Sequence, residues 1–277
     1  MGLSQTSVLV DNSCPDNTTG ESAPEWALPA HPSYPNPQIA EAVCEFRFSL
    51  QPGAPWQATS LGELFKVLQP TYPQLEPVTE QSVELIIAPD GIPVQKMGAS
   101  RVRFKMRHAS QPFILMITEG VFNVNALAPY PGWATFKAEL EAVWPHFIHV
   151  INPAALHQIG MRYINRIPRS TDDESAGMWL RESDYVPRAV LGSGPGYVAR
   201  VEVQADALNR RMITIAHDVS SQPGALIFDI DCVWKHDAAS AWNDVDPELE
   251  RLHENVWEIF NEAKAEKLDE LLSRRTD

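Results

Sequence analysis

The fold is decided by Glu41-Ala-Val-Cys-Glu-Phe-Arg-Phe-Ser-Leu50 and Gly160-Met-Arg-Tyr-Ile-Asn-Arg-Ile167. Every second position of the first stretch is apolar, which predicts a strand with one buried face formed by Ala42, Cys44, Phe46 and Phe48. The second stretch is predicted to be the corresponding strand in the other half of the chain. Each strand opens a unit in which the hydrophobic period indicates the same succession of elements.

That succession is strand, helix, three strands and a long amphipathic helix, first over residues 35–152 and again over 153–277. Neither half covers its own sheet, so the two are expected to share one core. The predicted fold class is α+β, with pseudo-duplicated β-α-β-β-β-α units forming a mainly antiparallel sheet. Long helices are expected over one face of this sheet, in a helix-grip or saddle-like arrangement with the two opening strands at the centre.

The turn signals and helical spacing also give boundaries. In the first half we expect a strand over 41–50, a helix from 60 to 70 opened by a Ser60/Glu63 capping box, strands over 82–88, 100–108 and 112–125, and a helix over 133–144 that Pro145 bends or ends. In the second half we expect a strand over 156–167, a short helical piece near 182–190, strands over 197–204, 211–218 and 225–233, and a closing helix of about 26 residues from Asp246.

Composition narrows the class of protein. The 277 residues include 36 acids and 22 basic residues, a formal charge of -14, which disfavours generic nucleic-acid binding. Cys14, Cys44 and Cys232 form no C-x-x-C pair, so a reducing compartment is expected rather than a disulfide scaffold. Residues 1–25 are expected to be a disordered leader before a single domain over 26–277, and the absence of a signal peptide or membrane span predicts a cytoplasmic protein without membrane contact.

The sharpest local charge pattern is a cationic strand. Alternation in Arg101-Val-Arg-Phe-Lys-Met-Arg107 places four cations on one face: Arg101, Arg103, Lys105 and Arg107. Such a stripe is able to follow an anionic polymer or an acidic protein surface. The more ordinary interpretation, which we favour, is a solvated face whose cations pair with acids of neighbouring strands, such as Glu84 or Glu119.

A second group joins the two opening strands. If these strands pair, Glu45 or Arg47 is expected within cross-strand reach of Arg162 or Arg166, with Asn165 nearby. A structural charge network is the favoured interpretation, since partly buried ions need partners. The functional alternative is a guanidinium platform for a carboxylate or phosphate ligand.

The same residues carry a resemblance to a known family. The segments Asn36-Pro-Gln-Ile-Ala-Glu-Ala-Val43 with Glu45-Phe-Arg-Phe48, and Gly160-Met-Arg-Tyr-Ile-Asn-Arg-Ile167, resemble the signature stretches of a sporadically distributed family of uncharacterised bacterial proteins of similar size. Met161 stands where that family has leucine, a swap of similar volume. The resemblance implies the boundaries and a bacterial cytosolic setting, and it supplies no activity, cofactor or catalytic residue.

No catalytic, metal or cofactor motif is recognised. The histidines lack a zinc spacing such as H-E-x-x-H, the glycine-rich 192–196 segment is a turn rather than a phosphate loop, and no Gly-x-Ser-x-Gly elbow exists. The leading hypothesis is therefore a non-enzymatic cytosolic binding or assembly protein, whose open sheet face takes a protein partner or a second copy. The alternatives are polyanion recognition through the cationic strand, and an enzyme acting on a small acidic substrate in a helix-covered cavity, with Glu45 or Asp229 as base and Arg162 as anion clamp.

Overall fold

The computed structural model describes residues 31, 33–53, 56–87, 93–171, 173–192, 197–218, 220, 223–235 and 245–275, without the side chains of 58 and 80–101. The chain divides into two compact units, 1–31 and 32–277, and the second is described below. The predicted leader over 1–25 and most of the predicted turn over 192–196 lie outside the described residues.

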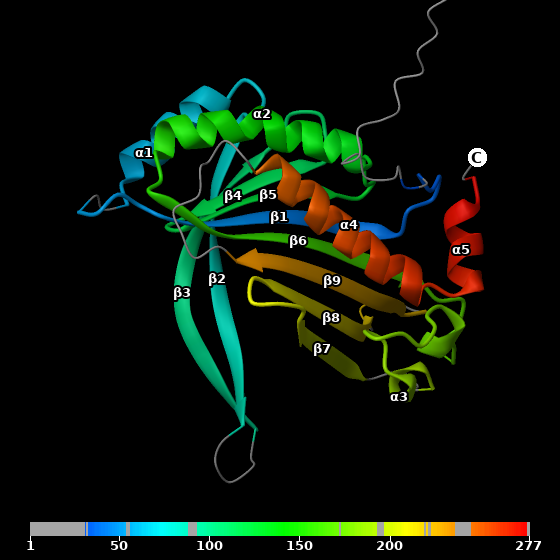
Figure 1. Ribbon diagram of the computed structural model, residues 1–277. Helices are drawn as coiled ribbons and strands as arrows, with labels where there is room; N and C mark the ends of the chain where they lie inside the picture. The colour runs from blue at the N-terminus through cyan, green and yellow to red at the C-terminus, as the bar shows by residue number, and fades with distance from the viewer. Residues whose placement is uncertain are drawn as a thin grey trace, which may run out of the picture. The chain divides into compact units, whose positions relative to one another are not determined.

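The body is α+β and is built on one antiparallel sheet of nine strands, in the order β2-β3-β4-β5-β1-β6-β9-β8-β7 (Figure 1). Its strands are β1 (Ile39–Ser49), β2 (Gln74–Ile87), β3 (Pro93–Arg107), β4 (Phe113–Thr118), β5 (Val121–Leu127), β6 (Ala155–Pro168), β7 (Val198–Gln204), β8 (Asn209–Asp218) and β9 (Ala225–Lys235). Every neighbouring pair in this order is antiparallel.

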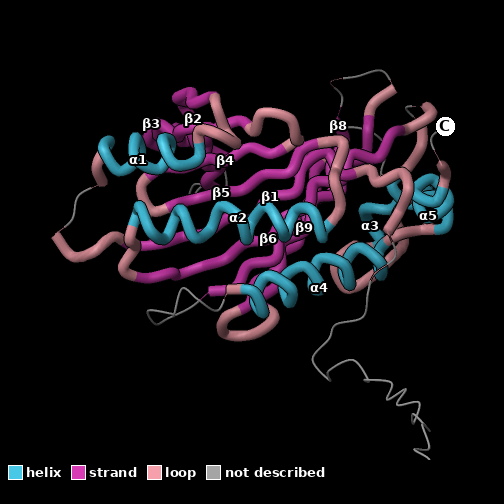
Figure 2. The backbone as a smooth tube through the Cα atoms, turned by 90° about the horizontal axis from the view of Figure 1, so that it is seen from above, coloured by secondary structure: helices cyan, strands magenta, loops and turns pink. Residues whose placement is uncertain are grey.

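Three helices cover one face of the sheet (Figures 1 and 2). These are α1 (Ala58–Leu68), α2 (Trp133–Ile151) and α4 (Asp246–Ala263), while the shorter η1 (Ala176–Met178), α3 (Arg188–Leu191) and α5 (Glu266–Ser273) lie toward one end. Within the described ranges, no helix has both the length and the apolar character required to cross a bilayer. The opposite face of the sheet carries none of the described helices.

The two opening strands lie side by side at the centre, as predicted. β1 pairs with β6 along most of its length, with Glu45 opposite Gly160 and Val43 opposite Arg162. The predicted alternation in β1 is also confirmed, because Cys44 and Phe46 are buried on the helix side while Arg47 is exposed. This register gives the sheet an apolar face toward the helices and a polar face toward solvent.

Aromatic side chains fill the layer between the helices and the first half of the sheet. Phe46 of β1 packs on Trp144 of α2 with ring centroids 4.2 Å apart, and Phe122 of β5 stacks on Phe147 at 4.5 Å. Burial of each such ring stabilises the fold by roughly 1.5 to 3 kcal/mol. α4 contributes the corresponding cover over β6 and β9, with Phe260 packed near Phe228.

Several predicted boundaries in the first half are wrong. The single strand over 112–125 is two strands, because the turn at Gly120 adopts a φ of 74° that glycine tolerates. The predicted capping box is absent: α1 begins at Ala58, Ser60 lies inside it, and Gln57 occupies the N-cap position. α2 passes through Pro145 and continues to Ile151, since Phe147 and Ile151 are buried and their packing offsets the lost hydrogen bond.

The second half departs from prediction mainly in its helices. The closing helix is broken at Lys264 and Ala265, where Ala265 N donates to Trp179 O and Arg181 N donates to Ala263 O. This short antiparallel contact takes the backbone out of the helix and leaves α4 and α5 as separate elements. The helical piece expected near 182–190 is reduced to α3.

The β2–β3 hairpin extends well past the rest of the sheet (Figure 1). The two strands pair from Gln74/Arg107 to Ile87/Pro93, whereas β4 pairs with β3 only over Phe104–Arg107. β2 starts eight residues earlier than the predicted 82–88 strand and includes Pro77, which is tolerated on a strand at the sheet edge.

Replacing Phe46 tests the central packing. Phe46 is 1% exposed and contacts rings of both β5 and α2. We expect Phe46→Ala to lower the free energy of unfolding by about 3 to 5 kcal/mol in urea denaturation, because it leaves a cavity under α2. Val102→Ala, at a position 48% exposed, is the control and is expected to cost less than about 1 kcal/mol. Similar losses for both variants would contradict this packing.

Candidate functional site

A groove occupies the centre of the uncovered sheet face. It has a volume of about 520 Å³ and is lined from β1, β3, β4, β5, β6, β8 and β9. Seven charged side chains surround it: Glu41, Glu45, Arg47, Arg103, Arg162, Arg210 and Asp231. Acids and arginines are therefore mixed in one concave polar surface rather than separated by sign.

The strand register brings these residues together. Across β5, β1, β6 and β9, one row runs Asn123, Glu45, Gly160 and Val233. The adjoining row runs Asn125, Val43, Arg162 and Asp231. Residues of each row point to the same face, because paired positions in an antiparallel sheet project together. The polar face predicted for β1 is thus continued across four strands.

The predicted central group is divided among separate ion pairs. Arg162 binds Asp229 through two hydrogen bonds, of 2.8 Å from Nε and 2.7 Å from Nη2. This bond to Asp229, more than any other interaction, raises the pKa of Arg162. Arg47 donates to Glu45 of its own strand at 2.7 Å. Glu45 and Arg162 are diagonal neighbours, as expected, but each is held by a different partner.

Arg166 and Asn165 lie apart from this group. Arg166 pairs with Asp218 of β8 at 3.0 Å. The hydrogen bonds from Ser220 and then the Arg166 pair lower the pKa of Asp218 to about 2. Asn165 faces the helix side, is 4% exposed and donates to Phe228 O at 3.0 Å. Its amide satisfies a buried backbone carbonyl of β9, so Asn165 lies on the opposite side of the sheet from the groove.

One cation of the cationic strand has an acid partner on the neighbouring strand. Lys105 forms an ion pair of 3.0 Å with Glu76 of β2, an acid that the sequence prediction did not name. The side chain of Glu84, one of the two acids that it did name, lies outside the described residues. Arg103 lines the groove, and Arg107 is exposed opposite Ile114. The side chain of Arg101 lies outside the described residues.

Sequence reasoning did not select several residues that define the groove, namely Gly160, Asn123, Asn125, Arg210 and Asp231. Asn123 and Asn125 are 5% and 6% exposed, and their Oδ1 atoms have no hydrogen-bond partner among the described residues. Asn125 donates from Nδ2 to Glu41 at 2.6 Å, which fixes the orientation of its amide. The sequence signals for these residues were a glycine inside the strand β6 and two asparagines on the polar period of β5.

Asp231 has the most perturbed carboxyl of the groove. Burial, partly countered by Arg162 and reinforced by Asp229 and Glu45, raises its pKa to about 6. Within the described part of the chain, no hydrogen bond or ion pair holds this carboxylate. The charges of Arg162 and Arg210 therefore compensate its desolvation only in part.

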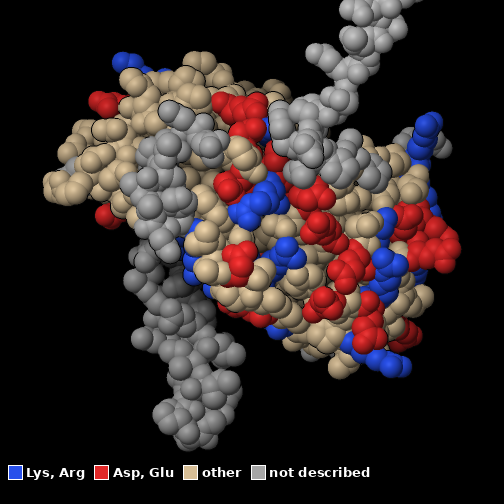
Figure 3. Space-filling model, in the orientation of Figure 1, with Lys and Arg blue, Asp and Glu red and all other residues tan. Residues whose placement is uncertain are grey.

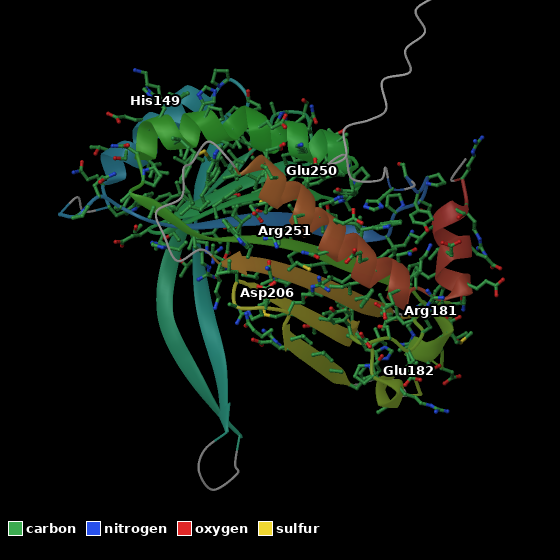
Figure 4. The ribbon with its side chains drawn as sticks, viewed as in Figure 1. His149, Arg181, Glu182, Asp206, Glu250 and Arg251 are labelled. Atoms are coloured by element: carbon green, nitrogen blue, oxygen red, sulfur yellow. The ribbon has the colours of Figure 1, made fainter. Side chains whose placement is uncertain are left out.

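On the helix side of the sheet, polar side chains join two of the helices. Glu250 of α4 accepts hydrogen bonds from Trp133 and Lys137 of α2, which joins the two helices. The next residue, Arg251, donates a hydrogen bond from Nη1 to Oδ1 of Asn209 at the start of β8. The turn that contains Asp206 lies just before this position in the chain (Figure 4). The surface over α4 has interspersed acids and bases (Figure 3). Below it lies the packed apolar core.

The described side chains provide no metal cage: nowhere among them do three His, Cys, Asp or Glu residues gather in a suitable arrangement. Comparison of the sequence with protein-family models gives no match, and comparison with curated proteins gives none either.

Neutralising Asp231 tests its environment. The folded pKa of about 6 lies above the ordinary value of 3.8, so the folded state binds more protons between these values and loses stability as pH rises through them. Asp231→Asn removes this effect. We expect the variant to match the wild type near pH 4 and to be more stable at pH 7 by on the order of 1 to 2 kcal/mol, after allowance for solvent screening.

The measurement is urea denaturation at a series of pH values. Asp218→Asn is the matched control, and it should have the opposite sign, because the lowered pKa of Asp218 contributes stability above pH 4. A destabilised Asp231→Asn at pH 7 would show that the carboxylate has a strong partner and would refute the assignment.

Proposed function

We propose that the protein is a non-enzymatic binding or assembly protein, which uses the uncovered face of its sheet to hold a protein partner or a second copy. The observation that carries this proposal is the groove. Among the described residues, the buried Oδ1 atoms of Asn123 and Asn125 have no hydrogen-bond partner, and no hydrogen bond holds the carboxylate of Asp231. Buried polar groups are normally hydrogen-bonded, so unsatisfied ones on a concave surface favour a bound partner that supplies the missing donors.

The two alternative functions are less well supported. The enzyme hypothesis needs Asp229 as a base and Arg162 as an anion clamp, yet these groups neutralise each other in a bidentate pair. The enzyme hypothesis also places the substrate in a cavity under the helices, where a packed apolar core lies. For polyanion recognition, the ion pair of Lys105 with Glu76 removes one of the cations that the stripe would use.

We also propose that the chain arose by duplication of a β-α-β-β-β-α unit in a helix-grip or saddle-like arrangement. In support, β1 and β6 pair at the centre and each half supplies a long helix to the same face. The halves differ, since four strands follow β1 and three follow β6 in the chain. A cytosolic setting and membership of the bacterial family named above remain part of this proposal, and they rest on the two signature stretches.

Filling the groove tests the proposed function. Met116→Trp places a rigid ring in the groove, whereas Val67→Trp places the same ring on α1 at a position 43% exposed. We expect native mass spectrometry of tagged protein from its natural host to show an oligomer or a partner complex. Met116→Trp should reduce this complex at least tenfold and Val67→Trp should leave it unchanged. A wild-type protein that is only monomeric, with nothing co-purifying, would overturn the proposal.

A further inference from the structure

The centre of the groove is a hollow above Gly160. A Cβ atom at this position would lie 3.8 Å from Val233 Cγ2, 3.9 Å from Asp231 Oδ1 and 3.9 Å from Glu45 Cβ. These are ordinary contact distances, so a Cβ atom fits above Gly160 without displacing its neighbours, and acids of the two neighbouring strands flank this position. Any side chain here would occupy it.

Two buried acceptors around this hollow, the Oδ1 atoms of Asn123 and Asn125, have no donor among the described residues, and the buried Nε of Arg210 has no acceptor there. Arg162, Arg47 and Arg210 are each bound to a carboxylate, namely Asp229, Glu45 and Glu202. In contrast, no hydrogen bond to Asp231 is found within the described ranges, and the buried Oδ1 of Asn125 also lacks a partner. Because Glu41 fixes the Asn125 amide, this oxygen is an acceptor and not a misassigned nitrogen. A hydrogen-bond donor would satisfy the asparagine oxygen and the Asp231 carboxylate, and beside two carboxyl groups a cationic donor is favoured.

We propose that the hollow above Gly160 receives the guanidinium group of an arginine side chain on a partner protein, between Asp231 and Glu45. This assignment rests on the proposed function and names the chemistry of the partner. A guanidinium group offers five donors in a planar fork, which suits a carboxylate surrounded by further acceptors better than a single ammonium does. Its charge also compensates the burial of Asp231.

Binding of the guanidinium group should weaken at low pH. The charged groups that face Asp231 are Glu45 on β1, Arg162 on β6, Arg210 on β8 and Asp229 on β9. A bound cation favours the ionised form of Asp231, so affinity is expected to decrease as pH falls from 7 to 5. Asp231→Asn should remove most of this dependence, which a merely structural role for the carboxyl would not predict.

The test uses the full chain, labelled with ¹⁵N, titrated with acetyl-Gly-Arg-Gly-amide and observed by NMR. The matched probe is the same tripeptide with citrulline, which keeps the shape and removes the charge. We expect the arginine peptide to bind with millimolar affinity and to shift amide signals of β1, β6 and β9. The citrulline peptide should bind at least tenfold more weakly. Equal binding of the two peptides, or no binding of either, would overturn the proposal.

Variants locate the site. Gly160→Val fills the hollow and should abolish binding of the arginine peptide, and Gly160→Ala, which makes only ordinary contacts, should weaken it. Gly62→Val is the control, since Gly62 lies on α1 in open space. Unchanged binding to both Gly160 variants would place the peptide elsewhere and reject the hollow. The two proposals can fail separately. A native complex that survives Asp231→Asn and Gly160→Val but not Met116→Trp would show that the sheet face binds a partner without this arginine contact. A wild type that forms no complex would refute the proposed function itself.

Discussion

The pairing of β1 with β6 is the constraint on which the rest of the structure depends. Each strand has a period of two, so one register sends Cys44, Phe46 and Met161 to the helices and Glu45, Gly160 and Arg162 to the open face. A slip of one residue would bury the charges and expose the rings. The strong apolar alternation of β1 thus fixes the register, and the register fixes the polar face as its consequence.

The polar groups buried on the open face lower the stability of the folded protein when no partner is bound. Desolvation raises the pKa of Asp231, and in the described part of the chain the buried amide oxygens of Asn123 and Asn125 have no donors. Such groups usually lower stability. Their concentration around one hollow, where Arg47, Arg162 and Arg210 are already paired with carboxylates, distinguishes the groove from an ordinary solvated sheet surface. The same contrast explains why an acidic protein would select a cationic group rather than a phosphate.

The sequence predicts the parts of the fold that depend on local pattern. The strands of the second half and the apolar face of β1 follow from periodicity and turn residues, and their positions agree with the structure to within a few residues. The errors lie where tertiary contacts override local signals. Burial of Phe147 and Ile151 allows α2 to continue past Pro145, and hydrogen bonds to the 179–181 segment interrupt the predicted closing helix. The site was predicted less well, because the partner of Arg162 and the environment of Asp231 depend on β9, whose register no local pattern reveals.

A crystal structure of the full chain with acetyl-Gly-Arg-Gly-amide would test the central claim most directly, since it shows the central pairing and the occupant of the groove together. The account predicts β1 beside β6, with the guanidinium group above Gly160 and hydrogen-bonded to Asp231. It would be contradicted by a peptide bound at another surface, by an empty hollow at a peptide concentration that saturates the protein in solution, or by β1 and β6 in separate positions.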